Sequence, residues 1–180
     1  ESELQIRAIG SDIFKDYLVL EERSNALPHI RIINQSSKEE HYLEFNEEAY
    51  VASAFANEEF DTDELRFEYS SMTTPETVYD YNMNSRTKEL KKQQEVVGGH
   101  NPNEYETKRL YAKARDGEEI PLTLVYKKGL VKDGNAPVVL YGYGSYGNTI
   151  EPYFSSVRLS LLDRGFIWAV AHIRGGQMQG

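Results

Sequence analysis

Short runs of branched and aromatic residues recur about every ten positions through the first hundred residues of this chain. Polar turns separate them, and one such turn, Asn25-Ala26-Leu27-Pro28, has typical turn chemistry. Evenly spaced short strands are typical of an antiparallel, all-β architecture. The predicted strands cover residues 17–21, 29–33, 41–45, 49–56, 64–70 and 77–81. Segments 16–45 and 50–90 each approach the length of a four-stranded propeller blade, about 40–45 residues. A β-sandwich would have the same pattern.

The pattern changes after residues 97–102, which contain two glycines and a proline and are suited to a linker. Residues 107–114 and 120–126 follow as two strand-like runs around Asp116-Gly117, which predicts a β-hairpin. We therefore place a domain boundary at 99/100, with residues 1–99 as the β-rich portion and residues 100–180 as a second domain.

The second domain contains a strand–helix–strand pattern. Residues 137–141 and 166–171 are continuous apolar runs, which predict strands buried on both faces. Residues 155–164 have helical spacing, and Gly165 follows as a stop signal. The apolar side of this helix is predicted to consist of Val157, Leu159, Leu161 and Leu162. Together these elements predict the start of an α/β sheet that is incomplete and has an unpaired, apolar edge. The whole chain is therefore expected to be an internal segment of a larger protein.

Composition excludes several classes of partner. The 180 residues carry a formal net charge of −9, and residues 1–100 hold 21 acidic and 10 basic side chains, so a nucleic-acid partner is disfavoured. No run of about 18 apolar residues is present, so no membrane span is expected. Cysteine is absent and the four histidines lack ligand spacing, so no metal site is predicted. Without a recognisable signal peptide, the expected location is the cytoplasm.

The densest group of residues that could carry chemistry is Tyr141-Gly142-Tyr143-Gly144-Ser145-Tyr146-Gly147. It follows a predicted buried strand, and the carboxyl ends of such strands are where ligand-binding groups of α/β folds collect. Ser145 does not fit a nucleophile elbow, because G-x-S-x-G requires glycine where Tyr143 stands. No G-K-[ST] follows, so a phosphate loop is excluded too. Spacing alone leaves a packed glycine turn and a functional loop equally open.

Read together, several motifs resemble the prolyl oligopeptidase family of serine peptidases, and within it the oligopeptidase B group. They are L-Y-G-Y-G-S-Y-G, R-L-S-L-L-D-R-G-F and A-H-I-R-G-G, with D-Y-L-V-L-E-E-R, S-S-M-T-T-P-E-T-V-Y-D-Y and A-R-D-G-E-E-I-P before them. The resemblance implies a mixed fold: the last blades of a seven-bladed β-propeller, followed by the first strands of an α/β-hydrolase domain. It also implies hydrolysis of short peptides, after Arg or Lys in the oligopeptidase B group, with no cofactor.

The resemblance assigns roles to four residues. Tyr143 matches the tyrosine whose hydroxyl completes the oxyanion hole, and Tyr146 matches an aromatic near the substrate pocket. Glu151 matches an acidic contact for a basic substrate residue, although the companion acidic position is Tyr153 here. Arg174 matches the R-G-G loop near the active-site entrance, where Gln177-Met178-Gln179 replaces the acidic residue that often follows. A structural pairing of Arg174 within the domain interface is the favoured alternative to a substrate contact. The Ser, Asp and His of the triad are expected beyond residue 180.

The expected partners are short, basic peptides and the remainder of the catalytic domain, and the 180 residues alone are expected to be inactive. Three alternatives remain: prolyl oligopeptidase specificity after Pro, a non-catalytic β-propeller binding module, and a lipase or esterase with the same hydrolase core.

Overall fold

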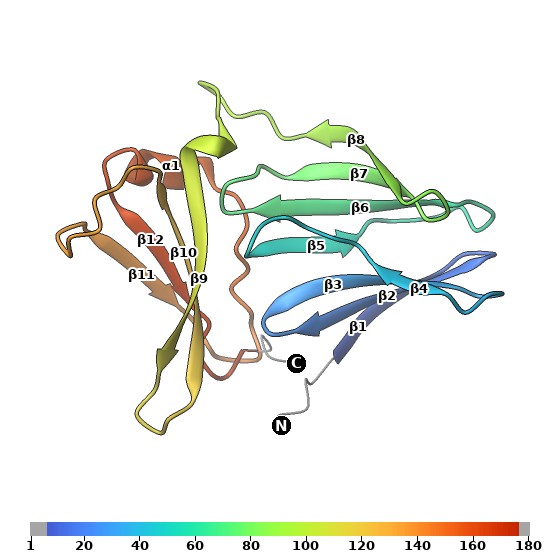
Figure 1. Ribbon diagram of the computed structural model, residues 1–180, viewed down its shortest axis with the longest axis horizontal. Helices are drawn as coiled ribbons and strands as arrows, with labels where there is room; N and C mark the ends of the chain where they lie inside the picture. The colour runs from blue at the N-terminus through green and yellow to red at the C-terminus, as the bar shows by residue number, and fades with distance from the viewer. Residues whose placement is uncertain (1–6, 177–180) are drawn as a thin grey trace.

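The computed structural model describes residues 7–176, which form three four-stranded sheets (Figure 1). The first sheet has the order β1-β2-β3-β4 and is antiparallel throughout. Its strands are β1 (Arg7–Ile13), β2 (Tyr17–Ser24), β3 (Leu27–Asn34) and β4 (Glu40–Tyr42). Strands β2 and β3 alternate between buried and more exposed residues, and this period of two gives the sheet one apolar face. The predicted segment began at residue 16, but the blade begins with β1, a strand that was not predicted.

The second sheet repeats this meander in the order β5-β6-β7-β8. Its strands are β5 (Tyr50–Ala54), β6 (Glu64–Ser71), β7 (Thr77–Asn82) and β8 (Thr87–Gln93). Strand β8 was not predicted, because all seven of its residues are exposed and it therefore has no apolar alternation. It forms by pairing with β7 at the sheet edge.

The two sheets pack face to face around one apolar core. Phe14, Val19 and Ile32 of the first unit meet Leu65 and Phe67 of the second, all at most 1% exposed. Phe45, in the connection between the sheets, stacks on Tyr69 with ring centroids 5.1 Å apart. Two adjacent four-stranded meanders joined in this way are propeller blades, as the segment lengths predicted.

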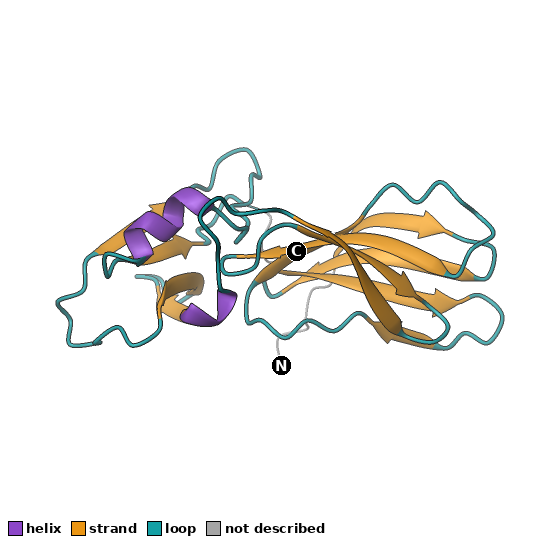
Figure 2. Cartoon of the chain, turned by 90° about the horizontal axis from the view of Figure 1, so that it is seen from above, coloured by secondary structure: helices purple, strands orange, loops and turns teal. Residues whose placement is uncertain are grey.

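The third sheet has the order β11-β12-β10-β9 and follows a short 3-10 helix, Pro102–Glu104. Its strands are β9 (Tyr105–Lys113), β10 (Glu119–Lys127), β11 (Val138–Gly142) and β12 (Ile167–Ala171), with α1 (Ser156–Leu162) between the last two. The predicted hairpin is confirmed: β9 and β10 pair antiparallel along their whole length. Strand β11 runs parallel to β12, as the strand–helix–strand pattern predicted, and α1 covers one face of the sheet (Figure 2). The predicted boundary at 99/100 lies between β8 and this sheet.

Two expectations about burial were wrong. Strand β11 is not buried on both faces: Val138 is 55% exposed and Leu140 is 66% exposed, because β11 is the sheet edge. Val157 was predicted on the apolar side of the helix but is 81% exposed, whereas Leu162 is fully buried. Apolar sequence runs identify a strand, but burial depends on which neighbours cover it.

Specific contacts tie the third sheet to the blades. Met72 of the second blade is buried with Val125 and Val170 of the third sheet and with Leu162 of helix α1. The Phe154 N–H donates to Ser70 Oγ over 3.1 Å. Other residues join the sheets by polar contacts: Glu48 accepts from Lys108 Nζ and the Arg109 N–H, and His100 Nε2 lies 2.6 Å from the Thr73 carbonyl. In the described part of the chain, no helix is long and apolar enough to cross a membrane.

Candidate functional site

The glycine-rich loop begins where strand β11 ends, and the R-G-G motif follows strand β12. Because these strands are parallel neighbours, their carboxyl ends lie at the same edge of the sheet. The Gly147 N–H donates to the Gly175 carbonyl over 3.0 Å, and Gly147 also bridges Gly176. Motifs separated by about thirty residues in sequence therefore form one substructure.

Glycine is required where the two loops touch. A Cβ on Gly144 would lie 2.2 Å from the Arg174 carbonyl oxygen, and a Cβ on Gly175 would lie 1.8 Å from the Gly144 carbonyl oxygen. Gly175 also has φ +96°, in the region that other residues rarely adopt. The backbones therefore pack directly on each other, which fixes where Tyr143 leaves the end of β11.

The two predicted tyrosines differ in exposure. Tyr143 is 40% exposed at the base of the loop, while Tyr146 is 95% exposed. Tyr146 also has φ +57°, an unfavourable conformation for a residue with a Cβ. Such strain is found mainly where the surrounding structure imposes a conformation, as at binding loops. Both residues are thus exposed on the surface of the loop.

Glu151 lies downstream of this loop and pairs with the first blade. Arg23 is the next-to-last residue of β2. It donates from Nη2 to Glu151 Oε1 over 2.5 Å and from Nη1 to Oε2 over 3.5 Å. The side chains are only 11% and 22% exposed, respectively. Glu151 therefore contacts a guanidinium, as its predicted role requires, but this guanidinium belongs to the protein. Arg23 was not singled out from the sequence, because nothing local marks a partner 128 positions away.

Arg174, the third charged residue of the region, pairs with Asp116 in the turn between β9 and β10. Both side chains are exposed, and the Arg174 guanidinium holds the pKa of Asp116 below its ordinary value. Arg174 thus links the R-G-G loop to the β9–β10 hairpin. The following Gln177–Gln179 segment lies outside the described residues.

A buried polar cluster behind the loop was also missed. The His172 ring, just after β12, is buried, and its Nε2 lies 2.8 Å from Thr123 Oγ1. Burial, and to a smaller extent the charges of Arg109 and Arg23, lower the pKa of His172 to about 4. His172 is therefore neutral at physiological pH. The Arg109 guanidinium donates to the Asn25 carbonyl, two residues after Arg23, so two guanidiniums lie at this seam.

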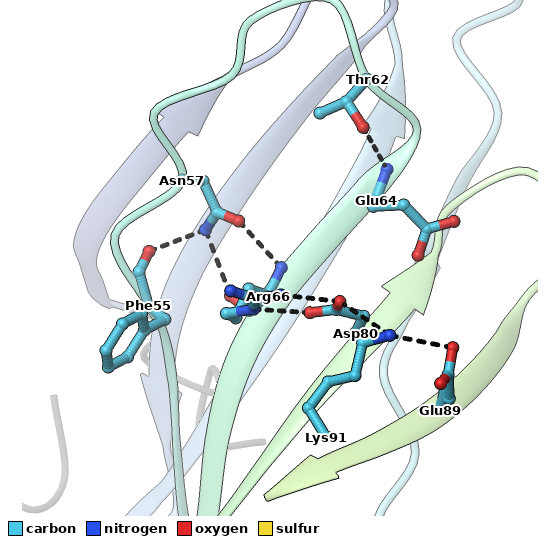
Figure 3. Close-up of polar contacts among 8 residues, drawn as sticks. All are labelled: Phe55, Asn57, Thr62, Glu64, Arg66, Asp80, Glu89 and Lys91. Atoms are coloured by element: carbon cyan, nitrogen blue, oxygen red, sulfur yellow. Dashed lines mark hydrogen bonds and ion pairs between the residues drawn. The ribbon is translucent and has the colours of Figure 1, made fainter.

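A second polar cluster lies far from this loop, on the outer face of the second blade (Figure 3). Arg66 Nε and Nη2 donate to the two oxygens of Asp80 over 2.7 and 2.8 Å. Lys91 forms ion pairs with both Asp80 and Glu89. The Asn57 side-chain amide accepts a hydrogen bond from the Arg66 N–H and donates one to the Arg66 carbonyl. These contacts run across β6, β7 and β8, so the cluster is a cross-strand ion-pair ladder. Among the described residues, no group of three or more potential ligands could hold a metal.

The ladder predicts acid-dependent stability. Hydrogen bonding by Arg66 lowers the pKa of Asp80, so the folded state favours the carboxylate. This stabilisation is complete above the unfolded-state pKa, about 3.9, and is lost as pH falls through the lower folded-state pKa. We expect Asp80→Asn to lower the free energy of unfolding by about 1 kcal/mol at pH 7, and the difference to shrink once pH falls below about 3.9, through the lower folded-state pKa of Asp80.

Urea unfolding of both proteins across this pH range measures the effect. Asp61→Asn is the matched control, because Asp61 makes a single exposed pair with Lys15; it should change stability by less than about 0.5 kcal/mol. A loss in Asp80→Asn that does not shrink between pH 7 and about pH 2 would show that charge is not its cause.

The fold and the loop define a class of protein, one in which β-propeller blades precede a mixed sheet with a glycine-rich loop at the end of a parallel strand. Residues 3–94 match the family described as "Prolyl oligopeptidase, N-terminal beta-propeller domain". The chain belongs to this family, whose members are serine peptidases. The resemblance to it, and to its oligopeptidase B group, is confirmed.

Individual relatives agree with this assignment. The chain is 45% identical to dipeptidyl aminopeptidase BI of Pseudoxanthomonas mexicana over 95% of its length, and 32% identical to protease 2 of Moraxella lacunata over 93%. It spans about a quarter of each relative, 24% in both cases. Oligopeptidase B of Trypanosoma brucei, solved in a closed form with covalently bound antipain, superposes over the whole chain with TM-score 0.87 and 34% identity. The chain covers 26% of that structure and 26% of oligopeptidase B from Leishmania major, which matches 97% of this chain with TM-score 0.87 and 32% identity.

Proposed function

We propose that this chain is part of a serine oligopeptidase that hydrolyses short peptides after Arg or Lys. In this proposal the third sheet is the beginning of an α/β-hydrolase domain, and Tyr143 donates a hydrogen bond to the oxyanion of the tetrahedral intermediate. The observation that supports it best is the backbone pairing of the Gly144 and Gly175 loops, which presents Tyr143 at the carboxyl end of a parallel strand. Acyl transfer needs a fixed donor of this kind, because negative charge develops on the former carbonyl oxygen.

The triad is proposed to come from outside residues 1–180. The imidazoles of His41, His100 and His172 contact Tyr81, the Thr73 carbonyl and Thr123, rather than an Asp–Ser pair. In α/β-hydrolases the nucleophile follows a later strand, and the remaining hydrolase strands would cover the exposed apolar side chains of β11. The complete enzyme, meaning this chain joined to those residues, is proposed to be cytoplasmic and to use no cofactor. Residues 1–180 alone are proposed to be inactive.

A second candidate concerns the mode of cleavage. The 45% identity to dipeptidyl aminopeptidase BI favours removal of dipeptides from a free amino terminus over internal cleavage. Cleavage after Pro is a third possibility, supported by 36% identity to prolyl endopeptidase of Elizabethkingia meningoseptica over 125 residues.

Hydrolysis of four fluorogenic peptides by the complete enzyme tests these proposals. The peptides end in Arg or Pro before the reporter group, each with a free or a blocked amino terminus. We expect kcat/KM for the Arg peptides to exceed that for the Pro peptides at least tenfold, with purified residues 1–180 as the inactive control. Faster cleavage of the Pro peptides would contradict the proposed specificity. Cleavage of free but not blocked Arg peptides would establish the dipeptidyl mode.

A further inference from the structure

The Arg23–Glu151 pair joins a propeller blade to the loop region of the candidate site. Arg23 holds both carboxylate oxygens of Glu151, at 2.5 and 3.5 Å, and both side chains are largely shielded from water. A fork of two N–H groups on one carboxylate is the arrangement by which an arginine side chain of a peptide would be recognised. The resident arginine therefore already makes the contact that a basic substrate residue would need.

The surrounding charges strengthen this competition. The Arg109 guanidinium is bonded to the Asn25 carbonyl, next to the end of β2 that carries Arg23. Tyr153, two residues after Glu151, is exposed and brings no charge. The Glu151 carboxylate thus already faces the Arg23 guanidinium, and a second guanidinium, that of Arg109, lies at the same seam.

We propose that Arg23 is a specificity-determining residue, which occupies Glu151 and so opposes binding of a second basic residue on the substrate. This inference rests on the proposed peptidase function. Cleavage occurs after an Arg or Lys, and the position in question is the substrate residue immediately before that Arg or Lys. A guanidinium at this position must displace Arg23 from Glu151 and thereby break a contact between blade and loop. A neutral residue at that position leaves the pair intact. The native enzyme consequently gains little from a paired basic sequence, and removal of Arg23 creates that preference.

The test compares two peptides that differ at one position, Arg-Arg and Ala-Arg before the reporter group. The measured quantity is the ratio of their kcat/KM values in the complete enzyme. We expect Arg23→Gln to raise the Arg-Arg/Ala-Arg ratio about tenfold, because Glu151 becomes available to the substrate. Arg23→Lys, which keeps the charge but loses the fork, should raise the ratio by less than threefold.

Glu151→Gln is the matched control, because it breaks the same blade-to-loop pair but removes the carboxylate. It should not raise the ratio, and the double variant should behave like Glu151→Gln. If Arg23 only supported the fold, Arg23→Gln would lower kcat/KM equally for both peptides and leave the ratio unchanged, which would overturn the proposal.

Calorimetric titration with the same two peptides separates this proposal from the proposed function. If the native protein cleaves neither peptide, the peptidase proposal fails, and the Arg-Arg/Ala-Arg affinity ratio in Arg23→Gln still decides the role of Arg23. An unchanged affinity ratio, or absence of binding to both peptides in every variant, would overturn the proposal.

Discussion

Replacement of Tyr143 by phenylalanine in the complete enzyme is expected to lower kcat about 100- to 1,000-fold, with a much smaller change in KM. The proposed role of its hydroxyl is to donate to the oxyanion, and a donor that acts only in the transition state contributes to kcat rather than to substrate binding. The phenyl ring keeps the packing at the end of β11, so the fold should be unaffected. Steady-state kinetics with an Arg peptide, at several substrate concentrations, separates the two constants.

Tyr141→Phe is the control for this measurement. Tyr141 lies two positions earlier on β11, is similarly exposed and stacks on Trp168 with ring centroids 6.5 Å apart. The loss of its hydroxyl should change kcat less than threefold. A Tyr143→Phe enzyme with unchanged kcat and raised KM would instead place the hydroxyl in ground-state substrate binding.

Gly175→Ala is expected to damage both stability and activity. The added Cβ would lie 1.8 Å from the Gly144 carbonyl oxygen, so the two loops must separate. Its positive φ adds about 1–2 kcal/mol for a residue with a Cβ. We expect the free energy of unfolding to fall by about 2–4 kcal/mol and kcat to fall at least 100-fold, because Tyr143 loses its support. Thermal unfolding and peptide hydrolysis measure the two effects.

Two further glycine variants separate the causes. Gly134 has φ +87° but no atom within 4 Å of an added Cβ, so Gly134→Ala should cost about 1–2 kcal/mol and leave kcat unchanged. Gly144→Ala introduces a clash, 2.2 Å from the Arg174 carbonyl oxygen, at a position without positive φ. It should resemble Gly175→Ala in activity. If Gly134→Ala and Gly175→Ala were equally active, contact between the two loops would not be what positions Tyr143.

Local patterns in the sequence were sufficient for most of the secondary structure. Strands β2, β3 and β6 could be predicted from short runs of branched and aromatic residues between polar turns. The β9–β10 hairpin was visible from its Asp-Gly turn, and helix α1 from its spacing. The strands that were missed, β1 and β8, lie at the edges of their sheets, where pairing replaces apolar burial as the cause of strand formation.

Only part of the candidate site could be predicted from the sequence. The glycine-rich loop and its tyrosines could be found in the sequence, because several unusual residues stand side by side there. The contacts that shape the site join distant segments: Gly144 to Gly175, His172 to Thr123, and Arg23 to Glu151. Each becomes possible only once β11 pairs parallel to β12 and the third sheet packs against the blades. The partner of Glu151 was also decided by the tertiary structure. From the sequence alone its carboxylate could be solvated or could bind a peptide, whereas the fold places Arg23 against it.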